Sequence, residues 1–166
     1  MTGLEWLEAL SYLVTIFGFP FAIWVFVREQ HKERQTDDEE VYLKLADDYE
    51  EFLKLALQHA DLRLMTFPTQ EVQLTPEQQE RRTVLFEILT ALFERAYILA
   101  YEPEMNREAT RRWQTWEDYM RAWCRRPDFR QQLPALLEGE DPEFRAYIRR
   151  LVSEVAQTPS PSRSAA

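Results

Sequence analysis

The chain has little of what active sites are usually built from: one cysteine, two histidines and three glycines in 166 residues. A single cysteine excludes a disulfide framework within one chain, as expected in a reducing compartment. It also excludes a zinc cluster, and neither His31 nor His59 has a partner at metal-ligand spacing. Walker-type, Gly-x-Gly-x-x-Gly and Gly-x-Ser-x-Gly elements are missing. We therefore predict no catalytic, cofactor-binding or metal-binding residues, and a protein that is not an enzyme.

What the chain does have is one long apolar run near its start. Residues 9–27 (ALSYLVTIFGFPFAIWVFV) carry no charged side chain. As a helix they would measure about 28 Å, close to the hydrocarbon thickness of a bilayer. No basic residue precedes the run and no small-residue cleavage site follows it, which argues against a secretory signal. The run therefore predicts a transmembrane helix in the lipid bilayer, in preference to a buried or peripheral helix.

Basic residues next to the run predict its orientation. Arg28, Lys32 and Arg34 follow the run, whereas no Lys or Arg precedes it. The positive-inside bias then places the N-terminus outside and the long C-terminal part in the cytoplasm. The predicted location is the cell (inner) membrane, with a single pass.

Small residues share one face of the predicted span. Ser11, Thr15, Gly18 and Ala22 follow one another at i, i+4, i+7 and i+11. Small residues let two membrane helices approach closely, so we predict this face to be the interface of a homo-oligomer. The alternative is that the face contacts lipid. Pro20 beside it would kink the helix, which a plain anchor tolerates.

Apolar residues recur at helical spacing in the rest of the chain, and strand signals are nearly absent. The first segment starts near the acids at 37–40 and runs to Ala60, with Leu57 on its apolar face. The second opens with Thr75, Pro76 and Gln78, a capping signal, and stops at Pro103. Its predicted apolar face is the clearest in the chain and consists of Leu85, Ile88, Leu89, Leu92, Phe93 and Ala96.

Three further helices are predicted from their start signals. One begins after Asn106 and ends at Pro127, a short one is capped by Asp128, and the last follows Asp141 and Pro142. The fold class is therefore all-α: an N-terminal transmembrane helix followed by an antiparallel helical bundle. The predicted divisions are a transmembrane anchor (1–28), a helical juxtamembrane linker (29–38), a cytoplasmic helical bundle (39–157) and a disordered tail (158–166).

Several side chains of the bundle invite a functional hypothesis. One face of the third predicted helix carries Trp113, Trp116, Met120 and Trp123. We expect these side chains to pack in the core. The alternatives are a ligand pocket and a surface on which nucleic-acid bases stack. Cys124 is expected to be a structural thiol, although neighbouring arginines could lower its pKa. Glu87 and Glu94 are expected on a solvated face.

Charge is unevenly spread along the chain. Residues 37–80 hold twelve acids and three bases, whereas residues 106–130 hold seven bases and four acids. The candidate interaction surface consists of Arg111, Arg112, Arg125 and Arg126. Such a surface could bind nucleic acid or anionic headgroups. With a net charge of −9, we instead expect acidic and basic faces to pair within the bundle or between subunits, and nucleic acid to be an unlikely partner.

The chain resembles a group of uncharacterised bacterial single-span membrane proteins with a cytoplasmic helical domain of unknown function. The resemblance rests on Pro20-Phe21-Ala22-Ile23-Trp24-Val25-Phe26, the charged linker, Trp113-x-x-Trp116 and Phe144-x-x-Tyr147-Ile148. The layout is also similar to CRISPR-accessory membrane proteins, which join a membrane helix to a HEPN-like bundle and assemble as pores. The HEPN element, Arg followed by four to six residues and His, is missing here. The positions that would hold its Arg are Phe52, Leu53 and Lys54 before His59, and Trp24, Val25 and Phe26 before His31.

Two functions are consistent with these features. The first is a non-enzymatic, membrane-anchored helical module that self-associates or binds an unknown cytoplasmic protein. The alternative is a homo-oligomeric membrane effector or pore-forming protein, in phage defence by the resemblance above.

Overall fold

The computed structural model describes residues 21, 23–26, 28, 39–66 and 73–157. Contacts divide the chain into two compact units, Met1–Glu40 and Val41–Ala166. All regular secondary structure in the described residues is helical, which confirms the all-α class.

In the N-terminal unit, the described residues of the apolar run are helical and their large side chains are exposed. The rings of Phe21 and Trp24 lie 5.9 Å apart. The guanidinium carbon of Arg28 lies 5.3 Å from the centre of the Trp24 ring. Among the residues that can be described, no helix has the length and apolar character needed to cross a bilayer.

Other predictions for the N-terminal part and the tail lie outside the described residues. These are the rest of the predicted span, the helical linker, the tail at 158–166 and the small-residue face of Ser11, Thr15, Gly18 and Ala22.

The second unit is a bundle of helices joined by short connections. Residues 39–58 are helical and belong to the bundle from Val41 on. The other elements are the short 3-10 helix η1 (Ala60–Leu62), α2 (Pro76–Ala100), α3 (Arg107–Cys124), α4 (Pro127–Leu136) and α5 (Pro142–Gln157).

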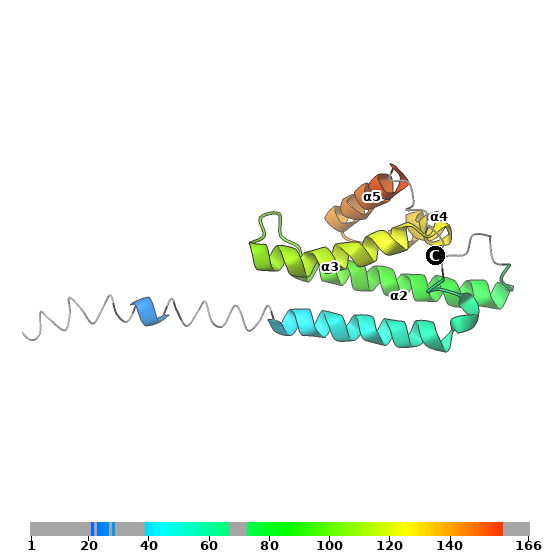
Figure 1. Cartoon of the computed structure of the whole chain (residues 1–166). Helices are drawn as coiled ribbons and strands as arrows, with labels where there is room; N and C mark the ends of the chain where they lie inside the picture. The colour runs from blue at the N-terminus through cyan, green and yellow to red at the C-terminus, as the bar shows by residue number, and fades with distance from the viewer. Residues whose placement is uncertain (1–20, 22, 27, 29–38, 67–72, 158–166) are drawn as a thin grey trace, which may run out of the picture. The chain divides into compact units, whose positions relative to one another are not determined.

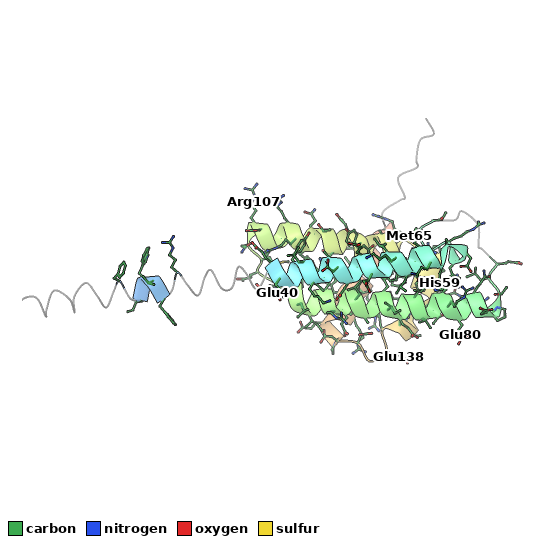
Figure 2. The ribbon with its side chains drawn as sticks, turned by 90° about the horizontal axis from the view of Figure 1, so that it is seen from below. Glu40, His59, Met65, Glu80, Arg107 and Glu138 are labelled. Carbon is green, nitrogen blue, oxygen red and sulfur yellow. The ribbon has the colours of Figure 1, made fainter. Side chains whose placement is uncertain are left out.

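The bundle has three layers (Figure 1). The α2–α3 pair lies in the middle, with the helix that ends at residue 58 on one side and α4 and α5 on the other. His59 and Glu80 lie at one end of the bundle and Arg107 at the other (Figure 2). Helix α2 therefore runs antiparallel to the first helix and to α3, as the short connections between them favour.

The predicted start signals of α2, α3 and α5 are confirmed. Thr75 and Gln78 form a reciprocal capping box, in which the Gln78 amide donates to Thr75 Oγ1 at 3.2 Å and the Thr75 amide donates to Gln78 Oε1 at 2.9 Å. Asn106 Oδ1 accepts from two first-turn amides of α3 at 2.9 Å each, and Asp141 Oδ1 does the same for α5. These bonds pair amides that a helix start would otherwise leave without acceptors.

The predicted cap of α4 is wrong. Arg126 is the N-cap, without a side-chain capping bond, and Asp128 lies inside the first turn. Pro127 explains the shift, because its fixed φ and missing N–H suit the first position of a helix. The Asp128 carboxylate instead accepts two hydrogen bonds from the Arg126 guanidinium, at 3.1 and 2.8 Å.

The tryptophan face of α3 forms the centre of the core, as predicted. Trp113, Trp116, Met120 and Trp123 are all buried. The first helix meets this face with Phe52, whose ring lies edge-on to Trp123 at 5.6 Å. Large aromatic side chains bury the most apolar area per residue, which suits a bundle of this size.

Helix α2 departs from its predicted pattern. Five of its six predicted apolar residues are buried, but Ile88 is 41% exposed. Leu57 of the first helix, also predicted to face the core, is 75% exposed. In α2 the departure is systematic, because further large aliphatic residues lie on the side away from the core. The helix is apolar on two faces, and its sequence is therefore poorly described as amphipathic.

The two faces of α2 should differ sharply in their effect on folding. Phe86 is fully buried, whereas Val84 is 48% exposed. We expect Phe86→Ala to lower the free energy of unfolding by about 3–5 kcal/mol, because it leaves a cavity in the core. Val84→Ala should change it by no more than about 0.5 kcal/mol. Denaturant titration of the dilute protein measures both values, and equal losses would contradict this assignment of the faces.

Candidate interaction surfaces

The four arginines predicted to form one surface differ in burial. Arg111 and Arg125 are exposed, Arg112 is half-buried and Arg126 is only 3% exposed. Arg111 and Arg112 belong to the N-terminal half of α3, and Arg125 is its C-terminal cap. Burial removes Arg126 from any docking surface, and the prediction that it belongs to one is wrong.

Arg126 holds a turn of the backbone in place. Its Nη1 donates to the carbonyl oxygens of Leu64 at 2.6 Å and Thr66 at 2.7 Å. Its Nε and Nη2 bond Asp128, and its guanidinium carbon lies 5.6 Å from the centre of the Trp123 ring. Arginine suits this role because its planar fork supplies several donors at once. The Arg126-Pro127-Asp128 sequence does not distinguish this residue from the other paired arginines, so sequence reasoning could not have found it.

Opposite charges pair within the bundle, as expected from the sequence. Arg95 of α2 reaches Asp48 at 2.8 Å, and Arg121 of α3 reaches Glu154 of α5 at 2.6 Å. Ion pairs at or near the surface contribute about 1 kcal/mol or less each. They set the register of neighbouring helices and neutralise part of the basic character of α3.

A polar network joins α3 to α5. The Tyr147 hydroxyl donates to a Glu117 carboxylate oxygen and accepts from Trp113 Nε1 at 3.0 Å. Arg121 Nη2 donates to the other Glu117 oxygen at 2.7 Å. Burial opposes ionisation of Glu117, but the bonds from Tyr147 and Arg121 outweigh it and lower its pKa. Burial and the Glu117 carboxylate both raise the pKa of Tyr147. The Glu117 carboxylate therefore stays ionised and the Tyr147 hydroxyl stays protonated, as suits a structural network.

Two carboxyl groups meet where α2 approaches the start of α5. Glu94 is half-buried and accepts a hydrogen bond from the Asp141 amide. Burial, together with the neighbouring Glu94, raises the pKa of Glu140 to about 7. The sequence predicts a solvated face for Glu87 and Glu94. Glu87 is exposed, but the prediction is wrong for Glu94 because the α4–α5 connection packs against it.

Cys124 is fully buried beside the tryptophan face, and burial raises its pKa to about 12. A thiol in this state is protonated and hidden from solvent. The prediction of a structural thiol is confirmed, and the alternative of a lowered pKa is wrong.

A shallow hollow of about 630 Å³ lies between the C-terminal end of α2 and the start of α5. Tyr97 and Tyr101 form part of its wall and stack on one another at 4.7 Å. Arg150, also on its wall, lies 4.7 Å from the centre of the Tyr147 ring. The aromatic groups lining the hollow are tyrosines, while the tryptophans predicted as an alternative ligand pocket pack into the core.

The most distinctive surface of the bundle is the side of α2 that faces away from the core. It carries four large aliphatic side chains, 41–59% exposed, around an exposed alanine. We call it the exposed α2 face: Val84, Ile88, Ala91, Ile98 and Leu99. Its middle positions, Val84, Ala91 and Ile98, lie seven residues apart. A seven-residue repeat is the signature of helix pairing, and this signal was available in the sequence.

Among the described residues, no group of three or more His, Cys, Asp or Glu side chains is placed to hold a metal ion. Comparison of the chain with protein-family models, with curated proteins and with solved structures finds no match.

The role of Arg126 can be separated from that of its neighbour. Arg126→Ala should lower the free energy of unfolding by about 2–4 kcal/mol, because two carbonyl groups and the Asp128 carboxylate lose a buried partner. Arg125→Ala, which removes an exposed side chain, should change it by less than about 0.5 kcal/mol. Denaturant titration gives both values, and a small loss for Arg126→Ala would contradict the structural role.

Glu140 should make stability depend on pH. Because its pKa is raised above the ordinary value of 4.5 in the folded state, the folded chain binds this proton more tightly than the unfolded chain. The stabilising contribution is therefore full below pH 4.5 and is lost as pH rises to about 7. Glu140→Gln should flatten the decline in melting temperature across this window. Glu138→Gln, in the same connection but exposed, should leave the decline unchanged. Identical profiles for all three proteins would contradict the coupling.

Proposed function

We propose that the protein is a non-enzymatic, membrane-anchored helical module whose bundle binds protein. The observation that carries this proposal is the exposed α2 face. Large aliphatic side chains gather on the solvent side of one central helix, and contiguous exposed apolar surface marks interaction sites. Scattered single residues of this kind would carry no such meaning.

The composition of the bundle favours a protein partner over nucleic acid. The chain carries a net charge of −9, and Arg126 is withdrawn from the basic surface of α3 into a structural contact. Nucleic acid binding depends on neutralising phosphates with exposed basic side chains. An apolar helix face rimmed by charges is instead suited to a partner helix.

The anchor is supported by the apolar run and by its described residues. Phe21, Trp24 and Phe26 are helical and exposed, and Arg28 follows with its guanidinium beside the Trp24 ring. Tryptophan and arginine are enriched where a span leaves the bilayer. The proposed arrangement is a single-pass anchor in the cell (inner) membrane with the N-terminus outside and the bundle in the cytoplasm. Such an anchor confines the bundle to two dimensions and raises its effective concentration toward partners.

Membrane attachment can be tested by flotation of the full chain with liposomes after carbonate washing. The wild-type chain should float. The double variant Val14→Arg/Phe17→Arg should stay in the dense fraction, because each arginine costs about 2.5–3.5 kcal/mol at the centre of a span. The matched variant Val14→Leu/Phe17→Leu preserves the apolar run and should float like the wild type.

The outcomes of flotation separate the possible roles. A wild-type chain that remains in the dense fraction would overturn the anchor. Leakage of a trapped dye from liposomes carrying the wild-type chain would contradict a simple anchored module and favour a pore-forming effector.

A further inference from the structure

We propose that the partner of the exposed α2 face is the same face of a second copy of this chain, with the two α2 helices parallel. This inference rests on the proposed interaction role of the bundle and names its partner. It follows from the way charge is arranged along the two edges of the face.

The edges of the exposed α2 face follow the same seven-residue repeat as its middle. One edge is acidic and consists of Glu80 and Glu87, which are exposed, and of Glu94, which is half-buried and already accepts a hydrogen bond from the Asp141 amide. The other edge is basic at its two ends and apolar between them, and consists of Arg81, Ile88 and Arg95. Arg81 is half-buried and pairs with Asp61 at 3.0 Å, so Arg95 is the more accessible of the two arginines. In a helix of 3.6 residues per turn, positions seven apart stay on one face, so these three rows run side by side along α2.

Opposite charge on the two edges selects the orientation of a pair. A two-fold axis parallel to α2 brings the acidic edge of one helix against the basic edge of its copy. A two-fold axis perpendicular to the plane of the pair makes the helices antiparallel and brings each edge against the same edge of the copy. Like charges in contact oppose association, so the parallel pair is favoured. Arg95 remains 57% exposed although it pairs with Asp48, and it is accessible to a second carboxylate.

The first helix of the bundle supports the same orientation. It lies next to the basic edge of α2, as the bond from Arg95 to Asp48 shows. Residues 39–58 hold six acids and two lysines. An antiparallel pair would bring the two acidic first helices to the same side of the contact, where they repel each other. In a parallel pair, the first helices of the two copies lie on opposite sides of the contact.

The middle row suits close approach of two helices. Ala91 lies between Val84 and Ile98, so the backbones can come together at its small side chain while the larger residues pack above and below it. The row covers about 21 Å of helix, a short contact, and the high local concentration that an anchor provides would strengthen the pair.

Single cysteines in the full chain, purified in mild detergent and oxidised, test the arrangement. In a parallel pair each middle position meets itself, so Val84→Cys and Ile98→Cys should each form a disulfide-linked dimer. Ala135→Cys is a matched control, because Ala135 is exposed on α4 away from this face, and it should stay monomeric. The wild-type chain should also stay monomeric, because Cys124 is buried. The parallel pair is overturned if Val84→Cys and Ile98→Cys do not cross-link. Cross-linking that occurs only in an Ala91→Cys variant overturns it as well.

Charge reversal gives a second test with an independent readout. Glu80→Lys/Glu87→Lys turns the acidic edge basic and should weaken the dimer at least about fivefold by sedimentation, because both symmetric contacts become repulsive. Glu108→Lys/Asp118→Lys makes the same change of charge on exposed positions of α3 and should leave association unchanged. Association that is unchanged or stronger after reversal of the acidic edge overturns the parallel arrangement.

Failure of this inference is distinguishable from failure of the proposed function. Flotation with liposomes without cross-linking at 84 and 98 would overturn the pair while leaving the anchor in place. Cross-linking at both positions in a chain that does not float would support the pair and overturn the anchor.

Discussion

The bundle is constrained by a central helix that is apolar on two sides but can bury only one of them in a single chain. Helix α2 packs Leu89, Phe93 and their neighbours against α3, α4 and α5. Its other side carries Val84, Ile88 and Ile98 into solvent. Full burial of an aliphatic side chain stabilises a fold by roughly 1.5–3 kcal/mol, and these half-exposed residues forgo about half of that. The other helices of the bundle leave this second face exposed. The charged residues along its two edges select the surface that can pack against it.

The rest of the core depends on aromatic packing between α3 and its neighbours. Trp123 meets Phe52 from the first helix and Phe86 from α2, and Trp113 donates to Tyr147 of α5. Helix α3 thus contacts the first helix, α2 and α5. Polar contacts then fix details that apolar packing leaves free: Arg126 holds the turn after η1, and Glu117 sets the register of α3 on α5. Buried polar groups with complete partners favour a single packing arrangement.

Much of the fold follows from short-range signals in the sequence. Thr75, Asn106 and Asp141 start helices in the structure because each offers an oxygen to amides that would otherwise lack acceptors. The tryptophan face could be predicted because its spacing and size leave few alternatives to burial. The tertiary partners of charged residues could not be predicted, because nothing local distinguishes buried Arg126 from exposed Arg125. The prediction for Ile88 is wrong for a related reason: the sequence of a helix that is apolar on two sides does not reveal which side its own chain will cover.

Hydroxyl-radical footprinting of the full chain over a range of protein concentrations measures directly whether a second copy covers the exposed α2 face. We expect Val84, Ile88 and Ile98 to become protected as concentration rises, while Leu57, which is 75% exposed on the first helix, stays reactive. Constant reactivity of all four residues, or protection of Leu57 alone, would contradict this expectation.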